Sequence, residues 1–261
     1  MKFLNLVWSH FKISIANEMQ YRVNFFVQLL HSLIALATGL IGIWLVFSYT
    51  NSLGGWTQPE LLAVMGIFML MGGFIQAAVT PNMQRLMGDI QEGTLDFCLT
   101  KPVDSQILAS VREFQFWQLT DGIAGLIVLV IAVVRMQVQI GIWQVLGFLA
   151  ALMMGAIMLY CFWLMLTTTA FWLLNIWELV DLFQGLYAAG RWPVTIYPDW
   201  MRIGLTFLVP VAFAVTVPAE ALTARLTPLA LLGTLGLTIF FVVAARTVWR
   251  LGTRRYSGAS A

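Results

Sequence analysis

Long apolar stretches recur along the chain, and they constrain its fold more than any other feature. A stretch of about 20 apolar residues is long enough to cross a hydrocarbon core of roughly 30 Å as a helix. Charged residues make up only 10% of the 261 residues, whereas a soluble domain carries about 25%. The sequence therefore predicts an all-α, polytopic membrane protein.

Six such spans are expected, with turn residues, prolines or charges between them. They cover residues 25–49, 61–80, 116–134, 142–172, 177–197 and 228–249. Pro81 and Asn82 are expected to close the second span, because proline removes a backbone donor and clashes with the preceding turn. With no internal repeat and no low-complexity linker, residues 24–261 are expected to form one membrane domain.

Two further segments are expected to lie in or dip into the membrane. In residues 1–23, apolar side chains at helical spacing alternate with lysines and polar residues, which favours an interfacial helix. An extension of the first span is the alternative, but spanning stretches tolerate few charges. Between the fifth and sixth spans, Pro198, Pro210 and Pro218 break an apolar run, which predicts a re-entrant hairpin packed against protein.

Lysine and arginine are unevenly distributed over the two sides of a six-span chain. Most of the 14 fall in residues 1–23, in the 81–118 segment or in the C-terminal tail. The exceptions are Arg135, Arg191, Arg202 and Arg225. The positive-inside rule then places both termini and the 81–118 segment in the cytoplasm.

Motifs of nucleotide-using and hydrolytic enzymes are missing from the sequence. No lysine follows a glycine and no two glycines are spaced i, i+2, which excludes both the phosphate loop and the GxGxxG turn. HExxH and GxSxG are also missing. Cys98 and Cys161 are too few for a structural zinc site. We expect no enzyme activity and no bound cofactor or metal, so a partner or an ion gradient must supply energy for any transport.

A polar segment interrupts the apolar chain at residues 85–106, RLMGDIQEGTLDFCLTKPVDSQ. Short helices are expected here, separated at Gly93 and Pro102, with Asp104 or Ser105 capping the last of them.

Leu95, Phe97 and Leu99 are expected to be exposed at the turn of this polar segment. Exposed apolar groups rimmed by charge are typical of a docking patch. A solvated loop lying against the membrane is the alternative, and composition alone does not separate the two.

Three stretches of the chain resemble one family. GDIQEGTLDFCLTKPVDSQ is similar to the cytoplasmic segment of ABC-2 type ABC-transporter permeases, which carry an EGxLDxxLxKP-like stretch between spans two and three. RWPVTIYPDW with the following LTFLVPVAFAVTVPAEAL resembles the hairpin between spans five and six of such permeases. The closing RRYSGASA resembles a bacterial branch with separate ATPase subunits.

The resemblance implies a half-transporter of the bacterial plasma membrane that works as a dimer, with either a second copy or a paralogous permease. Two cytoplasmic ATPase subunits would use ATP and Mg²⁺, and no nucleic acid would be bound. In the family, the helix after Gly93 is the coupling helix, which sits in a groove of the ATPase, and residues 1–23 match the elbow helix. The implied coupling residues are Gly88, Glu92, Gly93, Leu95, Asp96, Phe97, Leu99, Lys101, Pro102 and Asp104.

Acidic residues in the fifth expected span are candidates for substrate contacts. Glu178 and Asp181 are spaced i, i+3, and Gln184 continues the same helix face. They either line a path for a cationic amphipathic cargo or lie at the headgroup level, where charge is tolerated.

The expected function is a permease subunit of an ATP-driven exporter for an amphipathic or xenobiotic compound, a lipid or a glycan. The first alternative is a secondary transporter driven by ions. Against it, no expected span carries a deeply placed acid with a partner, and no inverted repeat is evident. The second alternative is a membrane scaffold that recruits a cytoplasmic protein without transport.

Overall fold

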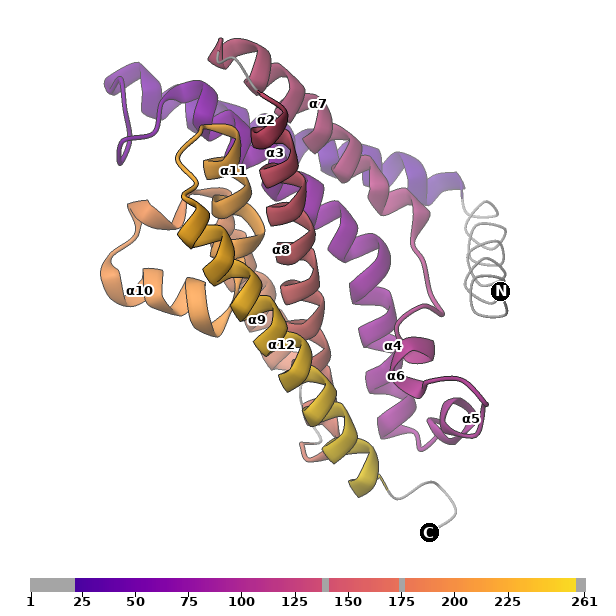
Figure 1. The fold of residues 1–261 in the computed structure, drawn as a ribbon. Coiled ribbons are helices and arrows are strands. Elements are labelled where there is room, and N and C mark those ends of the chain that lie inside the picture. The colour runs from indigo at the N-terminus through magenta and orange to yellow at the C-terminus, as the bar shows by residue number, and fades with distance from the viewer. Residues whose placement is uncertain (1–21, 138–140, 174–176, 257–261) are drawn as a thin grey trace.

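The computed structural model describes residues 22–137, 141–173 and 177–256, and the regular elements among them are helices (Figure 1). Five helices are long and apolar enough to cross a membrane, and one bent helix pair brings the possible spans to six. The expectation of a polytopic helical membrane protein is confirmed. Residues 1–21 of the expected interfacial helix lie outside the described residues.

The longer helices build the body of the molecule (Figure 1). They are α2 (Arg22–Tyr49), α3 (Gln58–Phe74), α4 (Thr80–Gln91), α7 (Leu119–Met136), α8 (Ile142–Thr168), α9 (Trp177–Ala188) and α12 (Pro228–Arg255). The shorter helices are α5 (Asp96–Leu99), α6 (Ser105–Ala109), α10 (Asp199–Ile203) and α11 (Val217–Leu222).

The second span does not end at Pro81, contrary to the prediction. A π-helical turn, Ile75–Val79, joins α3 to α4, so that one helix of 34 residues runs from Gln58 to Gln91. Pro81 lies in the first turn of α4, where its missing backbone donor is tolerated. At 1.5 Å per residue this helix is about 50 Å long, well beyond a hydrocarbon core of roughly 30 Å. Its end must therefore project from the membrane.

Helices α3 and α7 pack backbone against backbone. A Cβ atom on Gly125 of α7 would lie 2.5 Å from the Leu70 nitrogen, and one on Gly73 of α3 would lie 2.4 Å from the Gly122 nitrogen. Only glycine allows an approach this close, as is common between membrane helices. The two spans that flank the polar segment are therefore held together as a pair.

A second packing unit is formed by α8, α12 and the arms of the hairpin. A Cβ on Gly155 of α8 would lie 2.6 Å from the Phe213 carbonyl oxygen, so the hairpin backbone lies directly on α8. The two arms, Asp199–Phe207 and Ala212–Leu222, meet at 80°. This bent pair fits the expected re-entrant hairpin, and Val209 and Pro210 lie at the bend.

The fifth expected span, residues 177–197, is not one continuous helix. Helix α9 has 12 residues, about 18 Å at 1.5 Å per residue, and 3₁₀ turns follow it at Ala189–Arg191 and Val194–Ile196. Pro193 and Pro198 cannot continue an α-helix, which explains the break.

Candidate functional site: a braced projection

The projecting end of α4 and the helices α5 and α6 form a compact unit at one end of the molecule, which we call the projection (residues 80–115; Figure 1). The last turns of α12 lie beside it. The start of α2 lies in the same half, since Phe25 packs against Trp117, just before α7, with ring centroids 5.0 Å apart.

A glycine turn ends α4 and reverses the chain into α5. Gly93 has φ +73°, a left-handed conformation that favours glycine. The Thr94 amide donates to the Asp89 carbonyl oxygen at 2.9 Å, the bond that closes a Schellman motif. Gly88, in contrast, lies inside α4, with nothing within 4 Å of the position that a Cβ would take. Of the two glycines, the turn requires only Gly93.

Asn82 joins α4 to the strand-like stretch before α7. Its side chain is buried; it accepts from the Arg112 and Glu113 amides at 2.8 and 2.9 Å, and it donates to the Ala78 and Glu113 carbonyl oxygens, both at 2.7 Å. All the hydrogen-bonding groups of the amide are used. Asn82 thus fixes the return of the chain along α4.

Two ion pairs reinforce this return. Arg112 pairs with Asp89 in a largely buried position, and Arg85 pairs with Glu113 on the surface. Since a buried pair is costly to break, the Arg112–Asp89 pair contributes more to the shape of the projection than the exposed one.

Asp104 connects the projection to the last span. Its carboxylate caps α6 by accepting from the Gln106 amide at 3.0 Å, which confirms Asp104 as the expected cap. Arg246 of α12 donates to Asp104 at 3.0 Å and to the Gln106 side chain at 2.8 Å. These hydrogen bonds from Arg246, more than any other cause, hold the pKa of Asp104 below its ordinary value.

Helix α8 supplies a further contact. The Tyr160 hydroxyl lies 2.7 Å from the Ser110 hydroxyl at the end of α6. Helices α8 and α12 of the second packing unit therefore both touch α6, and α4 continues into α3 of the first packing unit.

The three apolar residues that we expected to be exposed do not all lie at the surface. Leu95 is wholly buried, because the glycine turn folds it back onto the core, and Leu99 is half-buried against the same core. Phe97 is 75% exposed. The expectation of exposure is wrong for Leu95 and confirmed for Phe97, which leaves one large apolar side chain at the tip.

Other residues near Phe97 in the sequence are exposed too. They are Glu92, Lys101 and Pro102, while Asp96 begins α5 half-buried. Cys98 of α5 is buried, and this burial raises the pKa of its thiol. The end of the projection therefore exposes one large aromatic side chain and charges of both signs.

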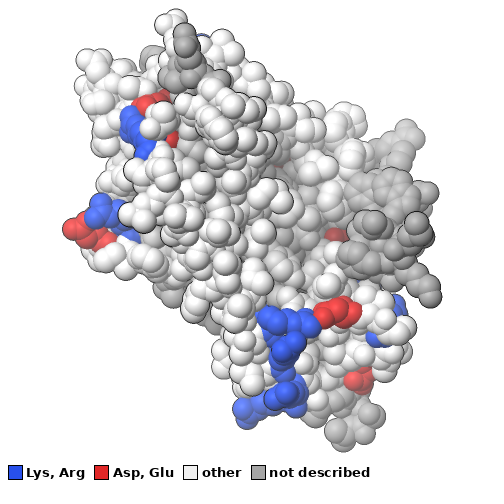
Figure 2. Space-filling model, viewed as in Figure 1, with Lys and Arg blue, Asp and Glu red and all other residues white. Residues whose placement is uncertain are grey.

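Arginine is concentrated at this end of the protein. On the face in Figure 2, most Lys and Arg atoms gather over the last turns of α12 and the projection, and two smaller charged groups lie over the opposite half. The four arginines in the second half of α12 are Arg246, Arg250, Arg254 and Arg255.

At the opposite end of the molecule, other polar contacts join the loop after α2 to later segments of the chain. Arg225 pairs with Glu60 at 2.7 Å and lies 4.7 Å from the Trp56 ring centroid. The Trp56 indole donates to the Thr195 hydroxyl at 2.9 Å, so the loop after α2 is tied to the segment before the hairpin.

The candidate substrate residues Glu178, Asp181 and Gln184 share α9. Glu178 and Asp181 are exposed in the single chain and Gln184 is half-buried. No metal-binding group of three His, Cys, Asp or Glu residues occurs in the part of the chain that the structure describes.

Sequence reasoning missed a polar contact between the first and third spans. Asp121 of α7 accepts hydrogen bonds from Gln28 and the buried Ser32 of α2. Residues 28 and 32 share a helix face, but no spacing in the sequence indicates a partner some 90 residues away. The contacts of Arg246 with Asp104 and of Asn82 with Arg112 were not predicted for the same reason.

The geometry defines the class as a multi-pass helical membrane protein with a braced polar projection at one end. A family model described as ABC-2 family transporter protein matches residues 33–260. The chain therefore belongs to the ABC-2 transporter family, whose membrane domains are typically not catalytic. Searches of curated proteins and of solved structures gave no match.

Proposed function

We propose that this chain is the permease subunit of an ATP-driven exporter and that the projection docks on a cytoplasmic ATPase. The observation that carries the proposal is the exposed Phe97 on α5, in a unit that α3, α8 and α12 hold in place. A large apolar anchor with a polar rim is typical of the centre of a binding interface.

The bracing supports a mechanical role for the projection. A push on α5 reaches α3 through the continuous α3–α4 helix. It also reaches α12 through the Asp104–Arg246 contact and α8 through Ser110–Tyr160. Movement of the ATPase subunits would thus be passed to several spans at once rather than absorbed by a flexible loop.

The arginine-rich end supports placing the projection and both termini in the cytoplasm of a bacterial plasma membrane, by the positive-inside rule. ATP and Mg²⁺ belong to the ATPase in this proposal. The permease would pair with a second copy or a paralogue. Between them they would move an amphipathic, xenobiotic, lipid or glycan-type compound outward, and the exposed face of α9 with Glu178 and Asp181 would line its path.

The proposal is tested by purifying the tagged chain from native membranes in mild detergent, followed by mass spectrometry and an ATPase assay. Wild type should retain a stoichiometric P-loop protein, and Phe97→Asp should reduce its recovery at least tenfold, as expected for an interface hot spot. Trp200→Asp is the matched control, since Trp200 is equally exposed, at 75%, but lies on α10. A stable chain without an ATPase partner would contradict the proposal.

A further inference from the structure

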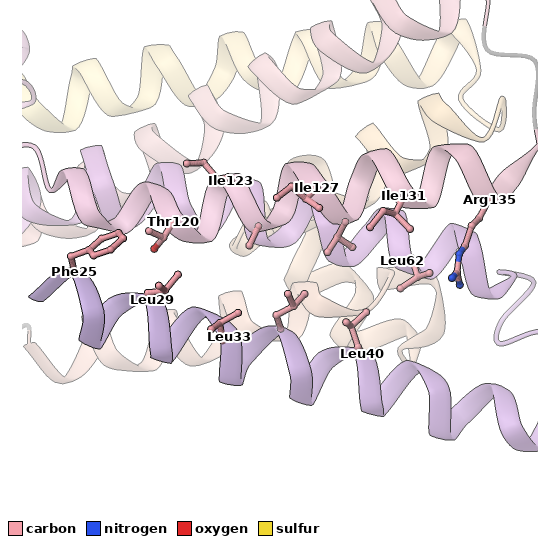
Figure 3. Close-up of a pocket in the computed structure, with 13 residues that line it drawn as sticks. Phe25, Leu29, Leu33, Leu40, Leu62, Thr120, Ile123, Ile127, Ile131 and Arg135 are labelled. Atoms are coloured by element: carbon pink, nitrogen blue, oxygen red, sulfur yellow. The ribbon is translucent and has the colours of Figure 1, made fainter.

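A groove of about 630 Å³ runs between α2 and the paired helices α3 and α7 (Figure 3). Leucines spaced three or four residues apart on α2 form one wall, among them Leu29, Leu33 and Leu40. Ile123 and Ile127 of α7 stand opposite them. The groove is thus an apolar channel that follows the length of two spans.

The proportions of the groove restrict what can occupy it. It extends along α7 from Thr120 to Arg135, which is about 22 Å at 1.5 Å per residue. Spread over this length, its volume leaves a mean cross-section of only about 30 Å². A space this long and narrow suits a single hydrocarbon chain. The length also exceeds the roughly 15 Å of one leaflet of the hydrocarbon core.

The two ends of the groove differ in charge. At the end remote from the projection, the Arg135 side chain extends from α7 toward the groove (Figure 3). Among the residues that the structure describes, it has no ion pair. At the other end Phe25 and Thr120 line the groove, and the nearby acid, Asp121, is already hydrogen-bonded by Gln28 and Ser32. Among the described residues that line the groove, Arg135 is the one charged side chain, and it is positive.

We propose that this groove binds one acyl chain of an anionic phospholipid, whose phosphate group pairs with Arg135. The lipid belongs to the leaflet remote from the projection, because Arg135 lies at that end of α7. The side chain of an arginine at a helix end reaches the headgroup level, where it pairs with phosphate. The acyl chain occupies the part of the groove nearest Arg135, because the groove is longer than one leaflet. This site is independent of the proposed docking of an ATPase.

The test is native mass spectrometry of the purified full-length chain titrated with phosphatidylglycerol and, separately, with phosphatidylcholine of the same acyl chains. Wild type should retain phosphatidylglycerol about fivefold better, the ratio that corresponds to the roughly 1 kcal/mol of one arginine near an anionic surface. Arg135→Gln should remove this preference, whereas Arg202→Gln should keep it, because Arg202 is paired with Asp199 on the hairpin.

A second pair of variants tests the groove itself. Leu33→Trp places a large ring in the groove and should reduce retention of both lipids at least fivefold. Leu30→Trp is the control, since Leu30 is exposed on the same helix and does not line the groove. Equal binding of the two lipids by wild type, or an unchanged preference in Arg135→Gln, would overturn the proposal. Loss of a dimer in Leu33→Trp but not in Leu30→Trp would show a subunit interface instead.

Discussion

Arg246, near the end of α12, donates hydrogen bonds to Asp104, which lies 142 residues earlier in the chain and begins α6. This contact joins the last span to the segment between the second and third. Both side chains are about one-third exposed, so the ion pair itself stabilises the fold by no more than about 1 kcal/mol. Its importance lies in the position of α6 relative to α12.

Replacing Asp104 separates its two roles. Asn caps helices as well as Asp does, so Asp104→Asn should lose only the pairing with Arg246 and cost less than about 1 kcal/mol. Asp104→Ala should cost about 1 kcal/mol more, because the cap is lost as well. Thermal unfolding in detergent, followed by tryptophan fluorescence, measures both. Equal stability of the two variants would remove the capping role.

The pH dependence of the same contact has a defined sign. Because the pKa of Asp104 is lowered, its contribution to stability is present above the ordinary carboxyl pKa and is lost as pH falls through the lowered value. Wild type should therefore lose its advantage over Asp104→Asn only in acid, below the ordinary carboxyl range. An advantage that disappears already near neutral pH would contradict this assignment.

Gly93 and Gly88 form a matched pair in the projection. Gly93→Ala should destabilise the protein by about 1 kcal/mol, because the left-handed conformation is costly for a residue with a Cβ. Gly88→Ala should be neutral or stabilising by up to about 1 kcal/mol, since it lies in open space inside α4. Unfolding curves of the two variants compare them directly. The reverse order would place the turn elsewhere.

Removing the Asn82 side chain should loosen the return of the chain along α4. Asn82→Leu leaves the amides of Arg112 and Glu113 without acceptors, which costs about 2–6 kcal/mol at about 1–3 kcal/mol per group. Hydrogen exchange at these two amides should accelerate. Thr100→Val is the control, because that exposed hydroxyl bonds only within its own helical turn. Unchanged exchange at 112 and 113 would mean that other contacts hold this stretch.

The α3–α7 contact can be tested with one methyl group at each of two glycines. Gly125→Ala places a Cβ 2.5 Å from the Leu70 nitrogen and should destabilise by about 1–3 kcal/mol through overpacking. Gly122→Ala meets only the Leu70 carbonyl oxygen at 3.8 Å, an ordinary contact, and should be tolerated. Yield of folded protein and unfolding temperature distinguish them. Similar losses in both would mean that the close approach of the two backbones at Gly125 is not the cause.

Alkylation of Cys98 reports on the docking of α5 against the core. Burial keeps this thiol protonated above its ordinary pKa, so modification at pH 8 should be at least tenfold slower than at an exposed thiol. Thr100→Cys, two residues further on, provides that exposed thiol in a Cys98→Ala, Cys161→Ala background, and Cys98 itself is measured in a Cys161→Ala background. Equal rates would mean that α5 opens readily.

Local features of the projection could be predicted from the sequence, and tertiary ones could not. The turn at Gly93 and the cap at Asp104 depend on residues within one helical turn. The burial of Leu95 depends on where that turn directs the chain, and the pairing of Asp104 with Arg246 joins distant segments. Neither leaves a periodic pattern in the sequence.

The membrane spans, too, could be predicted only in part. Apolar length identified the five long helices, because crossing a bilayer demands it. Pro81 was wrongly predicted to end the second span. Its effect depends on the π turn before it, in which each backbone hydrogen bond spans one residue more than in an α-helix. The interruption of residues 177–197 follows from Pro193 and Pro198, and the prediction of a continuous fifth span did not take Pro193 into account.

The π turn at Ile75–Val79 also determines how the residues of α4 are oriented around the helix axis. Such a turn takes in one residue more than an α turn, and one residue is about 100° of rotation around the helix axis. If the same residues formed a regular α-helix instead, Asn82 and Arg85 would be rotated by about 100° around the helix axis and would point to another side of the molecule. The direction in which the projection points around the axis of the α3–α4 helix is therefore set by this π turn.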